Sequence, residues 1–338
     1  MITKKILYID YLKLIGLLCI ILAHVCKNQY IMRLRNFDVT LLIIISGFLA
    51  IDSYERLLKN NKPIFEYYKK RILRLLIPTW TFLIIYFIII RIVCINDVYP
   101  YSINNIIRSF LLLDGIGYVW IIRVYLICSF LTPLFYYLNN KIKNSKIKIF
   151  FLLIVYIIYE LFVYYKINTL NIIFEYYIAY LIPYGIVYIF GMISRKKERK
   201  KDIIISITFF FVHILTAIIL YFKNNNVIQL TQAMKYPPRI YYLSYGIFVS
   251  FLLFFVLKKI NLKKFKIIDF CSKSSLWIYL WHIMIIFLLN TYYNSLNWKI
   301  KYIILLIGAI SLTFIQNKII DLLENTKASK KVLQVFRG

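Results

Sequence analysis

The chain has 338 residues, of which 62% are hydrophobic and only 17% charged, and its mean hydropathy is +0.73. Soluble globular proteins are about 45–50% apolar and about 25% charged, so this composition excludes an ordinary soluble enzyme and a disordered chain. The formal charge of +29 lies in short basic blocks between long apolar runs. This arrangement is typical of membrane topology, and we therefore expect a lipid bilayer and no nucleic acid as partner.

Ten apolar runs are long enough to cross a bilayer as helices, each of which needs about 20 residues. They lie near residues 8–26, 38–54, 75–95, 119–138, 147–165, 174–193, 203–222, 240–257, 275–290 and 300–320. The sequence predicts an all-α, polytopic integral membrane protein with about ten transmembrane helices. We expect one membrane-embedded domain over residues 1–323 and a short basic tail over residues 324–338.

The basic residues predict the direction of these spans, because cytoplasmic loops carry an excess of Lys and Arg. With the N-terminus in the cytoplasm, 30 of the 43 Lys and Arg fall on the cytoplasmic side and 11 on the external side. Only Lys13 and Arg123 are counted on neither side. We therefore expect a multi-pass protein of the plasma membrane with both termini in the cytoplasm.

Ionisable side chains inside spans are costly, and they are candidates for function. Asp10, Lys13 and His24 belong to the first span, and eleven positions of an α-helix return Lys13 and His24 to nearly the same face, about 16 Å apart. Asp10 lies close enough in sequence to pair with Lys13. The alternative is that Lys13 extends to the membrane surface and His24 is an interfacial residue.

A second basic element precedes the third span. Arg71 and Arg74 lie three residues apart on one side of a helix, directly after Lys70, and guanidinium groups bind phosphate through paired hydrogen bonds. Pro78 is expected to bend or interrupt the helix just beyond them. Most other basic clusters are interpreted as topology determinants that attract anionic lipid.

With these residues in place, the sequence resembles the acyltransferase-3 (acyl_transf_3) family of integral-membrane acyltransferases and is polysaccharide O-acetyltransferase-like. Four stretches carry the resemblance: Asp10-Tyr-Leu-Lys13 with His24 after ten further residues, Ile44-Ile45-Ser46-Gly47-Phe48-Leu49, Tyr68-Lys69-Lys70-Arg71-Ile72-Leu73-Arg74 with Pro78, and Trp120-Ile-Ile-Arg123 paired with Ser275-Leu-Trp277-Ile-Tyr279-Leu280-Trp281-His282. Lys13 stands where the family more often has Arg.

The resemblance implies transfer of an acyl group, usually acetyl from acetyl-CoA, to a hydroxyl of a cell-surface or lipid-linked carbohydrate of a bacterial envelope. It implies that His24 is the catalytic histidine, that Lys13 is its basic partner, and that Arg71 and Arg74 engage the donor. The chemistry agrees, because neutral imidazole can take the proton of a hydroxyl near pH 7. Direct transfer and a transient acyl-histidine both stay open. Acyl-CoA is then a substrate, and no bound cofactor is expected.

Three further residues are candidates for the acceptor site or its pocket. Trp120 and Arg123 could contact a sugar at the external side, or Trp120 could be an aromatic membrane anchor. His282 could line the pocket or simply pack. His213 is interpreted as a satisfied core histidine, and Glu160 as either a paired or a cavity-lining residue. No two histidines have metal-ligand spacing, so we expect no metal site.

The main alternative class is a multi-span transporter or flippase of an envelope glycan precursor, because charges inside the membrane often mark a substrate path. Transporters often consist of two related halves with broken helices in corresponding places, and this sequence shows no such symmetry. The acyltransferase is therefore the preferred prediction.

Overall fold

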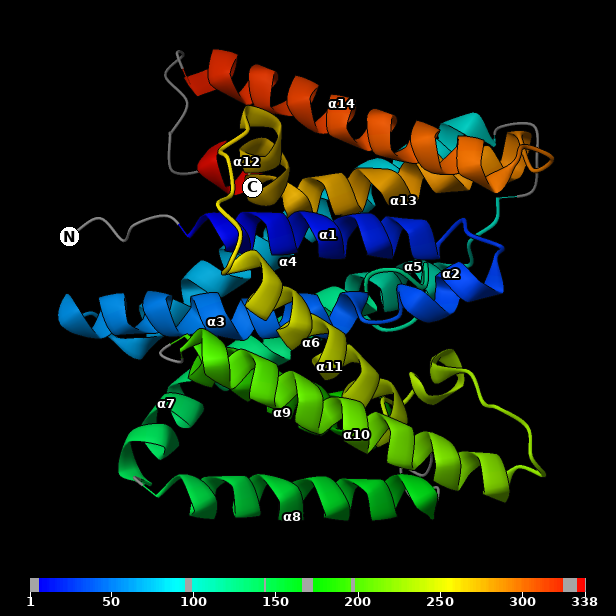
Figure 1. The fold of residues 1–338 in the computed structure, drawn as a ribbon. Helices are drawn as coiled ribbons and strands as arrows, with labels where there is room; N and C mark the ends of the chain where they lie inside the picture. The colour runs from blue at the N-terminus through cyan, green and yellow to red at the C-terminus, as the bar shows by residue number, and fades with distance from the viewer. Residues whose placement is uncertain are drawn as a thin grey trace. The chain divides into compact units, whose positions relative to one another are not determined.

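The computed structural model describes residues 6–94, 99–142, 144–165, 173–195, 198–324 and 333–337. Helices dominate these residues, and no strand occurs among them beyond an isolated bridge between Lys235 and Pro238. The helices in chain order (Figure 1) are α1 (Leu7–Ala23), α2 (Gln29–Leu34), α3 (Asp38–Lys59), α4 (Ile64–Val93), α5 (Ile103–Phe110), α6 (Trp120–Phe130), α7 (Thr132–Lys141), α8 (Ser145–Tyr164), α9 (Ala179–Ser194), α10 (Arg199–Lys223), α11 (Ile240–Leu257), α12 (Lys266–Lys273), α13 (Ser275–Tyr292) and α14 (Trp298–Glu324). The predicted all-α membrane architecture is confirmed.

Helical structure is present at each of the ten predicted spans. Within the described residues, eight helical stretches are long and apolar enough to cross a membrane. The two shorter ones are α1, which has 17 residues, and the apolar part of α8, Phe150–Tyr164. The protein is therefore a multi-pass membrane protein, and the count of ten spans stays a prediction.

Two prolines lie within or next to predicted spans, and they have different effects on the helices. Pro78 does not interrupt α4, which continues from Ile64 to Val93; the next hydroxyl, that of Thr79, donates to the Leu75 carbonyl at 2.7 Å. The predicted span 119–138 is instead divided at Leu131, between α6 and α7. Pro133 lies at the start of α7 and has no N–H to continue the hydrogen bonding of α6.

The chain divides into two compact units, each built from separate stretches of sequence. Unit 1 consists of Met1–Cys19, Asn28–Ile64 and Ile127–Lys264. Unit 2 consists of Ile20–Lys27, Phe65–Leu126 and Phe265–Gly338.

In unit 1, glycines permit a close crossing of α3 and α9. A Cβ atom on Gly47 would lie 2.1 Å from the Tyr188 carbonyl oxygen, and one on Gly191 would lie 2.0 Å from the Ile44 carbonyl oxygen. These distances are far below any contact that real Cβ atoms make, so each helix backbone rests directly on the other. The Ser46-Gly47-Phe48 stretch thus has a packing role, as small residues do where membrane helices approach closely.

Replacing Gly47 with Ala should force α3 and α9 apart and destabilise unit 1 by about 1–3 kcal/mol, the usual cost of overpacking. Gly185→Ala is the matched control on α9, because its new Cβ would meet its nearest neighbour, in Phe135, at an ordinary 3.9 Å. Thermal unfolding of the two purified variants in detergent measures the difference. Equal midpoints for Gly47→Ala and wild type would contradict the close crossing.

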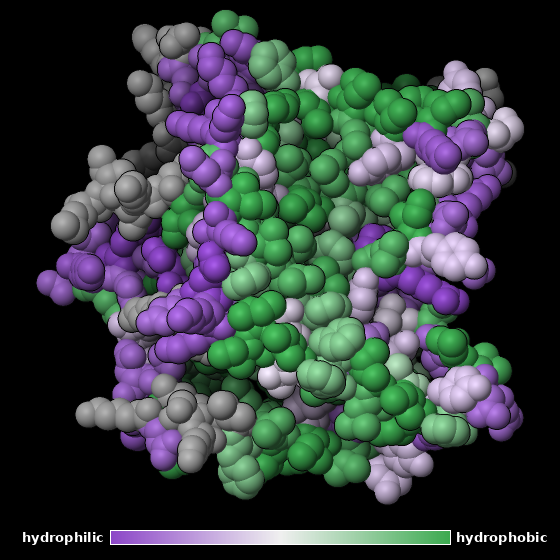
Figure 2. All heavy atoms as spheres, viewed as in Figure 1, coloured by the Kyte–Doolittle hydropathy of each residue, from purple (hydrophilic) through white to green (hydrophobic). Residues whose placement is uncertain are grey.

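The α10 helix of unit 1 presents a long exposed apolar surface. Only Asp202 and Ser206 are buried along its 25 residues. Figure 2 shows apolar side chains over the middle length of the helices, with hydrophilic ones gathered towards their ends. Asp202 pairs with Lys258 at 2.7 Å, which fixes α10 to the end of α11. The exposed apolar length of α10 is a surface suited to lipid.

In unit 2, aromatic residues join α4 to α13, and polar residues join α13 to α14. The Phe82 and Trp281 rings meet edge to face at 6.1 Å, and the Trp281 indole N–H donates to Gln316 at 2.7 Å. The described part of the C-terminal tail, residues 333–337, packs against α14 rather than extending freely. There Gln316 donates to the Phe336 carbonyl, and Arg337 forms ion pairs with α14 carboxylates.

The predicted topology can be tested with reporter fusions in the connections between helices. Fusions at residues 62, 144, 198 and 264 should report the cytoplasm, and fusions at 104, 228 and 296 should report the external side, because of the unequal basic charge. An eighth site, residue 168, should also report the external side and lies outside the described residues. One internal site on the wrong side would contradict the ten-span arrangement.

Candidate active site

His24 lies directly after the last residue of α1, Ala23. Its backbone N–H donates to the Ile21 carbonyl at 3.2 Å, so the end of α1 is a tightened turn of the i to i−3 type. Because His24 lies in this turn, the α-helical rotation of about 100° per residue holds only approximately between Lys13 and His24.

The rings of His24, Tyr118 and His282, from three separate parts of unit 2, meet one another. The His24 and Tyr118 rings form an edge-to-face contact with centroids 4.8 Å apart. The His24 and His282 rings stack with centroids 5.2 Å apart and an interplanar angle of 29°. Tyr118 and His282 also meet, at 6.3 Å. The structure thus brings together two of the predicted site residues, His24 and His282, and adds Tyr118.

His282 is fully buried on α13, with one ring nitrogen hydrogen-bonded and one not. Its Nδ1 bonds the Tyr279 carbonyl oxygen, which can only accept, so Nδ1 carries the proton. The other ring nitrogen, Nε2, is buried and has no hydrogen-bond partner among the described residues. In the neutral ring this nitrogen is an acceptor, and the ring that carries it stacks on the His24 ring.

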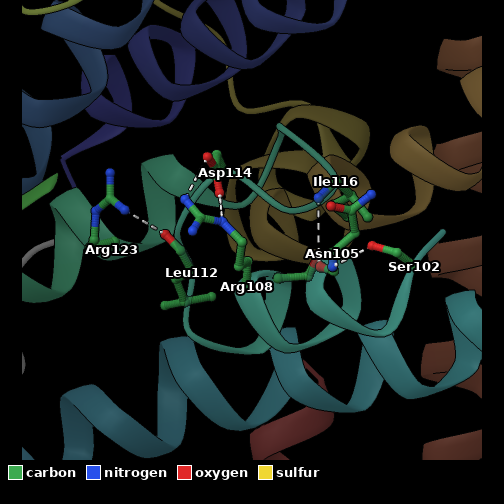
Figure 3. Close-up of polar contacts among 8 residues, drawn as sticks. Ser102, Asn105, Arg108, Leu112, Asp114, Ile116 and Arg123 are labelled. Carbon is green, nitrogen blue, oxygen red and sulfur yellow. Dashed lines mark hydrogen bonds and ion pairs between the residues drawn. The ribbon is translucent and has the colours of Figure 1, made fainter. Parts of the chain in front are cut away.

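The loop between α5 and α6, which carries Tyr118, is held by several polar contacts (Figure 3). The Arg108 guanidinium binds the Asp114 carboxylate through two hydrogen bonds, one of them Nη2 to Oδ2 at 2.7 Å. The Ser109 hydroxyl donates to the Asn105 carbonyl at 2.7 Å and accepts the Ile116 N–H at 2.9 Å. The loop is therefore a built structure within unit 2.

Arg123 also supports this loop. It is buried on α6, and its Nη1 donates to the Leu112 carbonyl at 2.9 Å (Figure 3). Leu112 has a φ of 57°, in the left-handed region that side chains other than glycine rarely adopt. The contact with Arg123 thus holds a strained residue of the loop. Trp120, the other predicted acceptor residue, is half-buried at the first position of α6.

The predicted donor-binding residues all lie on α4, in unit 2. Lys70 and Arg74 are exposed, and the Arg71 guanidinium lies over the Tyr67 ring at 4.8 Å from its centroid. Arg71 and Arg74 repel each other electrostatically, and neither forms an ion pair within the described part of the chain. Two uncompensated cations one turn apart are suited to an anionic ligand.

Asp10 and Lys13 belong to unit 1. Both lie on α1, where Asp10 is buried and Lys13 is half-buried. Each takes part in a polar or electrostatic interaction. That Lys13 and Asp10 act together with His24 is inferred from the spacing of these residues along one helix, and it stays a prediction.

The remaining intramembrane candidates have structural partners in unit 1. His213 stacks on the Tyr241 ring at 4.7 Å, and its Nδ1 bonds the Tyr241 carbonyl oxygen at 3.1 Å, as expected for a satisfied histidine. Glu160 accepts hydrogen bonds from Tyr156 and from the Ile240 N–H, and forms an ion pair with Arg239 at 2.8 Å. The described residues include no group of three His, Cys, Asp or Glu side chains able to hold a metal ion.

Tyr118 is the residue that sequence reasoning missed. Burial raises the pKa of its phenol, so the hydroxyl is protonated at neutral pH. The local signal was the Asp114-Gly115-Ile-Gly117 stretch before it, because two glycines so close together indicate a tight turn with a specific geometry. A Cβ on Gly115 would lie 2.0 Å from the Ser109 hydroxyl oxygen, and Gly117 has a φ of 78°.

Fold and site together define a helical, multi-pass membrane protein with a stacked pair of histidines, one of them fully buried. Its sequence matches the acyltransferase-3 family, described as an acyltransferase domain, over residues 6–316. The chain belongs to this family and is a membrane acyltransferase. Searches of curated proteins and of solved structures gave no match.

Proposed function

We propose that this protein transfers an acyl group, specifically acetyl, from acetyl-CoA to a hydroxyl of a cell-surface or lipid-linked carbohydrate. The observation that carries the proposal is the packing of His24 against Tyr118 and His282 in a unit that also contains the exposed basic start of α4. The setting that we propose is a bacterial plasma membrane, with both termini in the cytoplasm.

The donor binds first at the start of α4. Lys70, Arg71 and Arg74 bind the phosphates of CoA, which matches their exposure and the absence of an acidic partner for the two arginines within the described residues. From Arg74, α4 rises about 12 Å to Phe82, which contacts Trp281 beside His282. The thioester arm therefore follows α4 towards the histidine pair.

His24 then acts as the general base. It removes the proton of the acceptor hydroxyl while the oxygen attacks the thioester carbon. The carbon–sulfur bond breaks, and the proton passes from the imidazolium to the departing thiolate, which leaves an ester and free CoA thiol. We assign Lys13, with Asp10 close to it in sequence, the role of the basic partner of the signature on the strength of the family resemblance.

The acceptor sugar binds on the side of His24 that faces away from the donor. The Nε2 atom of His282 accepts a hydrogen bond from a neighbouring sugar hydroxyl. This role would give the buried nitrogen the hydrogen-bond partner that it lacks among the described residues. Trp120 stacks on the sugar ring at the start of α6. Arg123 acts through the loop that it holds at Leu112.

Analysis of envelope glycans from a host with and without the gene tests this function. We expect loss of one ester-linked acetyl group without the gene and its return with the wild-type gene. The position of the lost ester identifies the acceptor, and its mass identifies the acyl group. Identical ester contents in the two strains would contradict the proposal.

A further inference from the structure

The loop from α5 to α6 has an unusual number of constraints for its length. Leu112 and Gly117 have positive φ values, and the Gly115 backbone approaches Ser109 too closely for any side chain. Such strain persists only where the surrounding contacts compensate for it. Here Arg108 and Arg123 supply those contacts from the two flanking helices.

These contacts fix the backbone of the loop up to Tyr118. The residue directly follows Gly117, and the Tyr279 hydroxyl donates to its backbone carbonyl at 2.7 Å. Tyr279 is also the residue whose own carbonyl orients His282. One turn of α13 therefore positions both rings that contact His24.

The hydroxyl of Tyr118 is the unused group in this arrangement. A tyrosine hydroxyl that is partly buried usually has a hydrogen-bond partner. Tyr118 is half-buried, and its hydroxyl forms no hydrogen bond with any described residue. Its backbone carbonyl is held by Tyr279 and its ring packs on the His24 ring, so the side chain that contacts the base carries a donor without a partner among the described residues.

We propose that Tyr118 is a catalytic residue whose hydroxyl donates a hydrogen bond to the thioester carbonyl oxygen as that oxygen becomes an oxyanion. The inference rests on the proposed function. When the acceptor oxygen attacks, the carbonyl π electrons move onto oxygen, and a donor beside the base stabilises that charge. The phenol proton stays on Tyr118, while His24 alone carries the transferred proton.

Kinetics of full-length variants in detergent test this role, with acetyl-CoA as donor and an envelope glycan preparation from the gene-deleted host as acceptor. Tyr118→Phe keeps the ring and removes only the hydroxyl. We expect its kcat to fall about 100-fold, with the KM for acetyl-CoA unchanged, because loss of one oxyanion donor acts on the transition state. Tyr101→Phe is the matched control, since its half-buried hydroxyl bonds Tyr86 at 2.6 Å, and it should keep full activity.

The outcomes separate this inference from the proposed function. If Tyr118→Phe keeps wild-type kcat while His24→Ala is inactive, the hydroxyl has no catalytic role and the inference alone fails. The same holds if only Tyr118→Ala loses activity, because the ring then merely positions His24. If His24→Ala is active, or wild type transfers no acetyl group, the proposed function fails and the inference fails with it.

Discussion

His24→Ala should lose acyl transfer almost completely while the protein still accumulates in the membrane. A positioned general base contributes about 10²–10⁴-fold to a rate, and alanine offers no group to take the hydroxyl proton. His24 also lies in a turn after α1, outside the close crossing of α3 and α9, so the fold should survive the change. Ester-linked acetyl on the host glycan, measured against protein level, gives the result.

His213→Ala is the matched control for this experiment. His213 is also a membrane histidine in contact with a tyrosine ring, but its Nδ1 is bonded to the Tyr241 carbonyl within unit 1. It should therefore keep acyl transfer near the wild-type rate. Activity of His24→Ala equal to that of an active His213→Ala would remove His24 from the mechanism.

The helices could be predicted from sequence because long apolar runs in a bilayer have few alternatives to helix. What hydrophobicity could not indicate was the polar start of α4, which is helical from Ile64 although apolar residues dominate only beyond Arg74. The search for long apolar runs also missed α2, α5 and α12, because these helices are too short to span a membrane. These connecting helices are decided by caps and tertiary contacts, such as the Ser102 hydroxyl at the start of α5.

The candidate site was predictable in its residues and not in its contacts. His24 and His282 stand out because ionisable groups are rare in spans, but their stacking joins opposite ends of the chain and follows from tertiary packing. Arg123 is a candidate for contact with a sugar, and its guanidinium bonds the Leu112 carbonyl. That contact depends on the left-handed backbone of Leu112, which no local sequence pattern predicts.

Arg74→Ala should weaken CoA binding about 10- to 100-fold, because charge-assisted hydrogen bonds to phosphate contribute about 1.5–3 kcal/mol and each 1.4 kcal/mol is tenfold. Arg71→Ala should have a similar effect. It also removes the contact with the Tyr67 ring, so its thermal stability must be measured beside its affinity. Titration of CoA against each purified protein in detergent gives the comparison.

Lysine variants separate donor recognition from topology at the same positions. The positive-inside effect counts Lys and Arg alike, whereas lysine has no planar fork for phosphate. Arg74→Lys should therefore insert normally and recover only part of the lost CoA affinity. Lys259→Ala removes an exposed charge from the connection after α11 and should bind CoA as wild type does. If CoA affinity is unchanged in both Arg71→Ala and Arg74→Ala, these arginines serve topology alone and the donor must bind elsewhere, because a phosphate-binding pair cannot lose one guanidinium without loss of affinity.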